Sequence, residues 1–180
     1  MRQVAVWSAH RAGHNDHVMR WDAFAAAAPE LAALGLQGLG EQHLALIGTL
    51  RRDGWPRISA NEVYFVDGEL LLGMMPASRK SRDLERDPRL TLMTPQCDRE
   101  AKHGDVKLFG TAVAVTDRPL RERYGETIFA AIGWRPTEPY PLYRMEIESA
   151  AYISFGESRQ LLRWSPDTGL ERLRHPDEDG

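Results

Sequence analysis

The chain is poor in cysteine: Cys97 is the single one among 180 residues, so an intrachain disulfide is impossible. No apolar run reaches the roughly 18 residues that a membrane-spanning helix needs. Polar and charged residues also interrupt the N-terminus where a signal peptide would have its apolar segment. Neither sign of charge dominates, and the net charge of −3 gives no general attraction to nucleic acid or to anionic membranes. These absences predict a cytoplasmic protein that binds neither partner.

Recognisable catalytic groups are also absent. We find no Ser/His/Asp set and no paired carboxylates at a useful spacing, so no catalytic residue is assigned. The histidines His10, His14 and His17 could share a helix face, but no cysteine accompanies them, and we predict no metal site. The loop that carries Cys97 and His103 has no obvious reactive pair and reads as an ordinary loop.

The chain reads as one domain with two loose ends. Residues 1–20 are polar and without a clear period, which predicts a flexible arm. Residues 21–174 carry the regular elements, and residues 175–180 form an acidic tail that we expect to be disordered. Helical periods cover 21–39, where Asp22 could cap the start and Pro29 could divide the helix, and also 117–132.

Strand patterns follow from residue 44 onward, with Asp53-Gly54 and Asp67-Gly68 as hairpin turns and Gly110 as a bulge or bend. About six or seven strands in a hairpin-rich order predict a mainly β, α+β fold, an antiparallel barrel with peripheral helices. The segments with a strand pattern, more numerous than the strands expected in the barrel itself, are 44–50, 56–61, 62–66, 69–75, 90–94, 105–115, 143–155 and 160–164, with a short edge segment at 170–174.

The charge order after residue 78 is unusual. Ser78 is a good N-cap, yet Arg79, Lys80 and Arg82 occupy the first turns of the predicted helix, where the macrodipole disfavours cations. A bound phosphate would resolve this conflict, because free amides and basic side chains both attract an anion. The alternative is a solvated surface helix of mixed charge.

A polar row lies on the strand from Pro56 to Asn61. The period of two places Arg57, Ser59 and Asn61 on one face and Ile58 and Ala60 on the other. In the middle of a sheet, such a polar face is expected either to meet water or to line a site.

Three segments together resemble the pyridoxamine 5'-phosphate oxidase-like family of flavin-binding split barrels. They are Gly48 to Ser59, Ser78 to Arg89 with its Ser-Arg-Lys-Ser-Arg-Asp-Leu run, and Phe109 to Ala112, within a resemblance that covers about 43–164. The resemblance implies a six-stranded antiparallel split β-barrel, usually a homodimer, with flavin mononucleotide (FMN) between the subunits. The cofactor-binding residues it implies are Arg57, Ile58, Ser59, Ala60, Met74, Ser78, Arg79 and Lys80, of which Arg79 and Lys80 would bind the phosphate with support from Arg57.

The sequence departs from the vitamin B6 oxidases of that family in two places. Glu62 stands where those enzymes have a substrate-binding lysine. Their C-terminal arginine–histidine motif has no convincing counterpart, since Arg172 to His175 matches it only loosely. We therefore expect a flavin-dependent hydride-transfer enzyme with a less anionic substrate, which the sequence does not identify. An 8-hydroxy-5-deazaflavin reductase, a flavin-storing protein and a haem protein with His43, His103 or an N-terminal histidine as ligand are the alternatives.

A nucleic-acid contact through the basic helix is the weakest interpretation, because the chain has no extended basic face. For the expected homodimer, the apolar side chains of Leu108, Ile147 and Trp164 are candidate interface residues.

Overall fold

The computed structural model describes residues 18–96, 98–157 and 159–176. The segment 1–17 with its three histidines, and Cys97, lie outside this range. The helices are α1 (Trp21–Ala27), α2 (Pro29–Leu39), α3 (Arg79–Arg86) and α4 (Arg118–Ile132). The strands are β1 (Leu44–Leu50), β2 (Pro56–Glu62), β3 (Tyr64–Val66), β4 (Glu69–Gly73), β5 (Arg89–Met93), β6 (Asp105–Ala114), β7 (Leu142–Ser154), β8 (Gln160–Ser165) and β9 (Gly169–Leu173).

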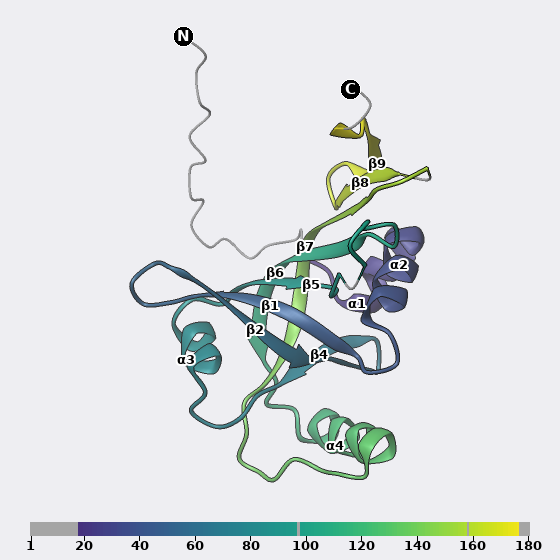
Figure 1. Ribbon diagram of the computed structural model, residues 1–180. Helices are drawn as coiled ribbons and strands as arrows, with labels where there is room; N and C mark the ends of the chain where they lie inside the picture. The colour runs from purple at the N-terminus through teal and green to yellow at the C-terminus, as the bar shows by residue number, and fades with distance from the viewer. Residues whose placement is uncertain (1–17, 97, 158, 177–180) are drawn as a thin grey trace.

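The strands form one antiparallel sheet in the order β2-β1-β5-β6-β7-β4-β3, and the β8–β9 hairpin continues from the far end of β7 (Figure 1). The mainly β fold is confirmed, although the described residues contain nine strands rather than six or seven. The sheet curls into a barrel that brings β2 close to β4. The barrel stays open there, because these two strands do not pair. One contact across this opening runs from Asn61 Nδ2 to the carbonyl oxygen of Gly73, at 3.4 Å.

The predicted irregularity at Gly110 is confirmed, since the β6–β7 register shifts between Phe109 and Gly110. The extra residue is Glu148 on β7, and it changes which face of β7 is buried: Met145 and Ile147 are buried before it, Ala150 and Tyr152 after it. A side chain at Gly110 would place its Cβ only 1.9 Å from the carbonyl oxygen of Glu146, so only glycine fits this close approach.

Helices α1 and α2 pack on one side of the sheet, against β6 and β7, while α3 lies on the other side and α4 below (Figure 1). Pro29 divides them as predicted, because it opens α2. The expected cap by Asp22 is wrong: Arg20 holds the N-cap position without a side-chain hydrogen bond, and Asp22 lies in the first turn, where its carboxylate accepts from the Ala23 amide.

The main core gathers side chains from α1, α2 and both halves of the barrel, and it includes the fully buried Phe24 and Leu31. Leu108, Ile147 and Trp164 also belong to this core, with at most 3% of each residue exposed. The prediction that these three form a dimer interface is therefore wrong. A strand pattern marks which residues turn inward, but it does not separate a chain's own core from a contact with a second copy.

The two predicted ends of the domain also need correction. Met19, expected in the flexible arm, forms a bridge to Ile147 of β7. His175, expected in the disordered tail, is buried, and its Nε2 lies 2.9 Å from the carbonyl oxygen of Ser154. The ordered structure thus continues past Leu173 to this histidine.

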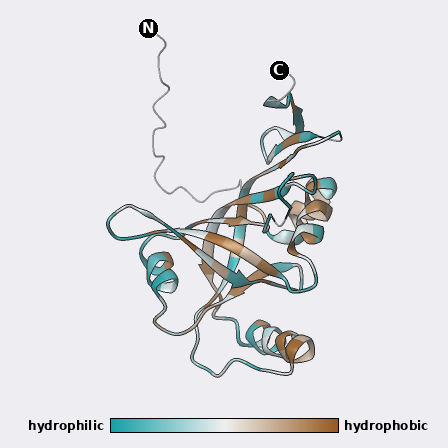
Figure 2. Cartoon of the chain, in the orientation of Figure 1, coloured by the Kyte–Doolittle hydropathy of each residue, from teal (hydrophilic) through white to brown (hydrophobic). Residues whose placement is uncertain are grey.

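Helix α4 packs against β3 and β4 through a second, smaller core that contains Leu71, Leu120 and Ile128. Figure 2 shows that its C-terminal end is apolar on the outside as well, where Phe129 and Ile132 are more than half exposed. No helix in the described part of the chain is long and apolar enough to cross a membrane.

Candidate functional site

The basic helix start that stood out in the sequence is confirmed as a helix N-terminus. Ser78 is the N-cap of α3, and its hydroxyl oxygen accepts from the Ser81 amide at 3.3 Å. Arg79 and Arg82 are exposed, and within the described residues neither forms an ion pair. The free amides of the first turn and two uncompensated guanidinium groups therefore lie at one end of one helix.

Lys80 points away from that helix start toward β2. Its Nζ donates to the carbonyl oxygen of Ala60 at 2.8 Å and to Asn61 Oδ1 at 2.6 Å. Burial lowers the pKa of Lys80 below its ordinary value, because desolvation disfavours the ammonium form. Lys80 thus joins α3 to the open edge of β2.

Arg57 has its charge balanced inside the protein. Its Nε lies 2.5 Å from Oδ2 of Asp83, a buried carboxylate on α3 that also accepts from Thr49 Oγ1 at 3.0 Å. Burial alone would raise the pKa of Asp83, but the hydrogen bonds from Arg57 and Thr49 hold it below its usual value. Arg57 therefore fixes α3 against the barrel.

The polar row on β2 is real, but its surroundings differ from the expectation. Arg57, Ser59 and Asn61 share the more buried face, whereas Ile58 is 74% exposed on the other. β2 is also an edge strand of the sheet and not a strand in its middle. The row is buried because α3, which follows β2 by more than fifteen residues, folds back over it.

A cavity of about 550 Å³ occupies the opening between β2 and β4. Of the eight predicted cofactor residues, Ala60, Met74 and Lys80 line it, while the other five lie outside its lining. The lining residues are Leu44, Ala60, Asn61, Glu62, Gly73, Met74, Met75, Pro76, Lys80, Tyr124, Ile128, Trp134, Pro136, Thr137 and Tyr140.

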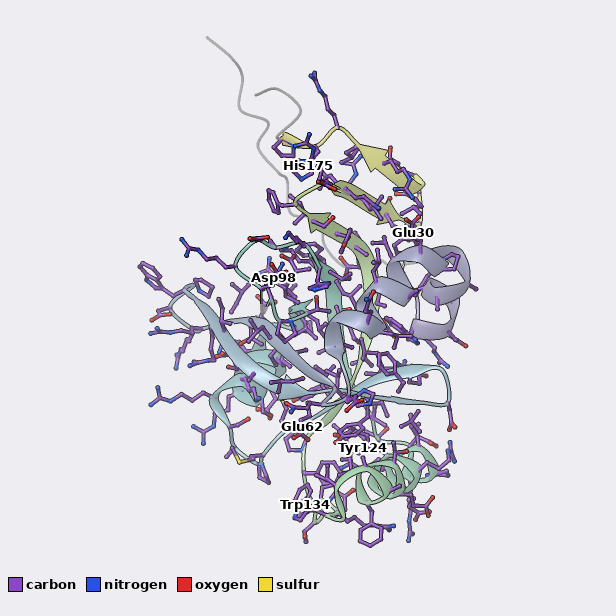
Figure 3. All side chains as sticks on the ribbon, turned by 45° about the vertical axis from the view of Figure 1, so that its right-hand side comes forward. Glu30, Glu62, Asp98, Tyr124, Trp134 and His175 are labelled. Carbon is purple, nitrogen blue, oxygen red and sulfur yellow. The ribbon has the colours of Figure 1, made fainter. Side chains whose placement is uncertain are left out.

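One wall of this cavity was missed by the sequence reasoning. It consists of Tyr124 and Ile128 from α4 and Trp134, Pro136, Thr137 and Tyr140 from the loop after it. Figure 3 shows Tyr124 and Trp134 at the same end of the molecule as Glu62. Trp134 is 58% exposed. In the sequence, this tryptophan in a proline-rich loop was the one signal that could have indicated the wall.

The loop is held against α4 by Arg121. Its guanidinium group makes two hydrogen bonds of 2.8 Å to the Glu138 carboxylate and donates to the carbonyl oxygens of Val115 and Tyr140. The same group lies 4.5 Å from the centre of the Tyr140 ring. The wall is therefore fixed by charge and hydrogen bonding as well as by packing.

Tyrosines connect the two walls at the β2 end. Tyr124 packs edge-on against Tyr64, and the Tyr64 hydroxyl donates to Glu62 Oε2 at 3.3 Å. Burial raises the pKa of Tyr124, and the negative charge of Glu62 adds to the rise. The Tyr124 hydroxyl also lies against the backbone of Gly73, where an added Cβ would come within 2.2 Å of its oxygen.

The histidines named as haem ligands in the alternative interpretation lie outside the cavity, as far as the structure describes them. No group of three or more possible metal ligands is found among the described residues, and no histidine lines the cavity. His103 lies in the loop before β6, where its amide donates to Asp98, a residue that lies apart from Glu62 in Figure 3. His43 stacks on Tyr64 but does not reach the cavity lining.

The chain was compared with protein families and with curated proteins. The family model for pyridoxamine 5'-phosphate oxidase matches residues 33–154, about two thirds of the chain. A search of curated proteins found no match.

Solved structures share the fold. A pyridoxamine 5'-phosphate oxidase-related, FMN-binding protein from Nostoc punctiforme is 13% identical with a TM-score of 0.58, covering 85% of this chain and 95% of that one. PhzG from Burkholderia lata, in complex with tetrahydrophenazine-1-carboxylic acid, is 16% identical with a TM-score of 0.54, covering 75% and 83%. A heme binding protein from Mycobacterium smegmatis is 17% identical with a TM-score of 0.57, covering 83% of this chain and 57% of that one.

Proposed function

The chain belongs to the pyridoxamine 5'-phosphate oxidase family, and from this premise we propose that it is an FMN-binding oxidoreductase that transfers hydride between the flavin and a small molecule. The observation that carries the proposal is the position of the cavity. It fills the opening between β2 and β4 and reaches α3 through Lys80, next to the two uncompensated arginines of that helix.

The donor set at the start of α3 fits a phosphate group. Ser78, the first-turn amides and Arg79 supply hydrogen-bond donors and positive charge at the helix end that attracts anions. Lys80 has its ammonium group on the cavity side of the same turn, beside Ala60 and Met74. In this arrangement Arg79 holds the phosphate, Lys80 joins it from the cavity side by exchanging its hydrogen bonds to Ala60 and Asn61, and Arg57 acts through Asp83 to keep α3 in position.

The flavin, when bound, would supply the hydride chemistry. The chain's own groups then orient it and exclude water. Met74 and Ala60 line the β2–β4 side of the opening, and the α4 wall faces them across the cavity. The related FMN-binding protein from Nostoc punctiforme supports a flavin in this fold.

Phosphate recognition is tested by titrating cofactor-free chain with FMN and with riboflavin, which lacks the phosphate. The wild type should bind FMN more tightly, and the double variant Arg79→Ala, Lys80→Ala should lose about 10- to 100-fold in FMN affinity, since a hydrogen bond to a charged group contributes about 1.5–3 kcal/mol. Riboflavin affinity should stay nearly unchanged. The matched control is Arg118→Ala on α4. Equal FMN binding by the double variant would remove the proposed phosphate site.

The alternative cofactor, an 8-hydroxy-5-deazaflavin, would occupy the same opening, and haem is the second alternative. Mass spectrometry of the small molecule released from native protein separates all three. A Soret band in the purified protein would establish haem and overturn the flavin proposal. The solved heme binding protein from Mycobacterium smegmatis is the reason to include this measurement.

We also propose that the protein is a homodimer that pairs near β2. This strand ends the sheet, so its outer edge has free backbone groups, and Trp55 and Ile58 beside it are 69% and 74% exposed. Sedimentation at micromolar concentration should give a dimer, and Ile58→Asp should give a monomer. Leu36→Asp, at an exposed leucine of α2, is the control that should remain dimeric. A wild-type monomer with cofactor bound would refute the proposal.

A further inference from the structure

The two ends of the cavity differ in charge. Lys80 is the one cation among the described lining residues, and it lies at the α3 end with its ammonium group already bonded to Ala60 and Asn61. Glu62 is the one anion in that lining. The α4 wall contributes Ile128, Trp134 and other aromatic or small groups, and no charged side chain.

The negative charge of Glu62 affects the α4 end of the cavity. Its carboxylate accepts from the Tyr64 hydroxyl, and the Tyr64 ring packs edge-on against Tyr124 of α4 at 5.9 Å between centroids. A ligand lying along the α4 wall would therefore meet a carboxylate and aromatic rings but no cation. An anionic ligand there would be repelled without compensation.

The shape of this wall favours a flat ligand. Trp134 lines the cavity while 58% of it stays exposed, and this exposed ring surface offers a planar molecule a stacking contact. Arg121 fixes the loop that carries Trp134 through its hydrogen bonds to Glu138 and Tyr140. The binding surface is therefore preorganised.

Resting on the proposed function, we infer that the second ligand of this site is a flat aromatic molecule without negative charge, bound between Trp134 and the cofactor with Glu62 at its edge. Phosphorylated and carboxylated aromatic molecules are excluded from the α4 end by Glu62 and by the absence of a cation from the described lining of that wall, since Arg121 lies behind Tyr140 and is neutralised by Glu138. Trp134 and Glu62 are the residues that determine this specificity.

The test uses two probes that share one ring system and differ in charge, 2-methyl-1,4-naphthoquinone and 1,4-naphthoquinone-2-sulfonate. Equilibrium dialysis against the oxidised, FMN-loaded chain measures the affinity of each without any reaction. The wild type should bind the uncharged probe at least about tenfold more tightly. Trp134→Ala should weaken both probes by about tenfold, as expected for the loss of one stacking surface.

Charge reversal gives the sharper result. Glu62→Lys should lower the preference for the uncharged probe by about tenfold, whereas Glu126→Lys, at an exposed glutamate of α4 outside the cavity lining, should leave it unchanged. Glu62→Gln should give an intermediate value and serves as the conservative variant.

Three results would overturn the inference: equal binding of the two probes by the wild type, equal shifts from Glu62→Lys and Glu126→Lys, or no binding of either probe. Failure of the proposed function is separately visible, because it appears as absent FMN binding before any probe is added. The same dialysis on cofactor-free chain then still reports the charge preference of the α4 wall.

Discussion

Replacing Asp83 by asparagine should lower the free energy of unfolding more than the removal of any single surface charge would. The Asp83 side chain is 5% exposed and lies between α3 and the barrel, where it accepts hydrogen bonds from Arg57 Nε at 2.5 Å and Thr49 Oγ1 at 3.0 Å. Asparagine keeps the shape and removes the charge, so the Arg57 guanidinium group, only 22% exposed, loses its counter-charge.

The size of the effect follows from this burial. Removing one partner of a buried ion pair costs about 3–5 kcal/mol, and the partial exposure of Arg57 reduces this to about 2–3 kcal/mol. In a chain of this length, each kcal/mol lowers Tm by about 2–4 °C, so Asp83→Asn should melt about 5–10 °C below wild type. Urea unfolding gives the free energy directly.

The control is Glu122→Gln, which breaks the exposed pair of Glu122 with Arg118 on α4. It should cost at most about 0.5 kcal/mol. If Asp83→Asn and Glu122→Gln have the same free energy of unfolding, the ion pair does not hold α3 against the barrel, and the structural role assigned to Arg57 is wrong.

The same carboxylate gives a pH dependence with a definite sign. Because the folded protein holds the pKa of Asp83 below its ordinary value of 3.8, the stability it contributes is complete above that value. It is lost as the pH falls through the lower folded pKa. The difference in unfolding free energy between wild type and Asp83→Asn should therefore shrink in acid and stay constant from pH 5 upward.

Three further predictions concern the cavity. Gly73→Ala should destabilise by about 1–3 kcal/mol, as other overpacked sites do, because the new Cβ would meet the Tyr124 hydroxyl; Tyr124→Phe in the same chain should recover part of the loss. Arg121→Met should speed hydrogen exchange in the loop 133–141, since the bonds to Glu138 are lost, while the barrel strands keep their protection. FMN-loaded wild type should form no pyridoxal 5'-phosphate from pyridoxine 5'-phosphate under air, because Glu62 repels the dianion; turnover near once per second would refute this.

The basic helix start and the strand alternation were predictable because both are local signals. The capping hydroxyl of Ser78, the cations behind it and the period of two along β2 need only neighbouring residues. What the sequence does not contain is the partner of each group. Arg57 in the predicted polar row and Lys80 at the predicted helix start carry the same charge, yet one pairs with Asp83 and the other crosses to Ala60.

The α4 wall was not predictable for a related reason. Tyr124 has the spacing of an ordinary buried helix residue, and the fold alone brings it against Gly73, some fifty positions earlier. The change of buried face in β7 is similar. Glu148 becomes the extra residue only because β6 approaches closely at Gly110, and a single strand read alone gives no sign of the shift.

The position of β7 in the sheet bears on synthesis of the chain from its N-terminus. Strands β1, β2, β5 and β6 can pair with one another as they emerge, but the three-residue ladder of β3 and β4 has no other strand partner until Leu142 begins β7. An isolated two-stranded hairpin is marginal in water. Leu71, fully buried in the finished fold among residues of α4 and β7, therefore lacks most of its packing partners until those elements are made, so we expect this hairpin to be among the last parts of the sheet to become protected during synthesis.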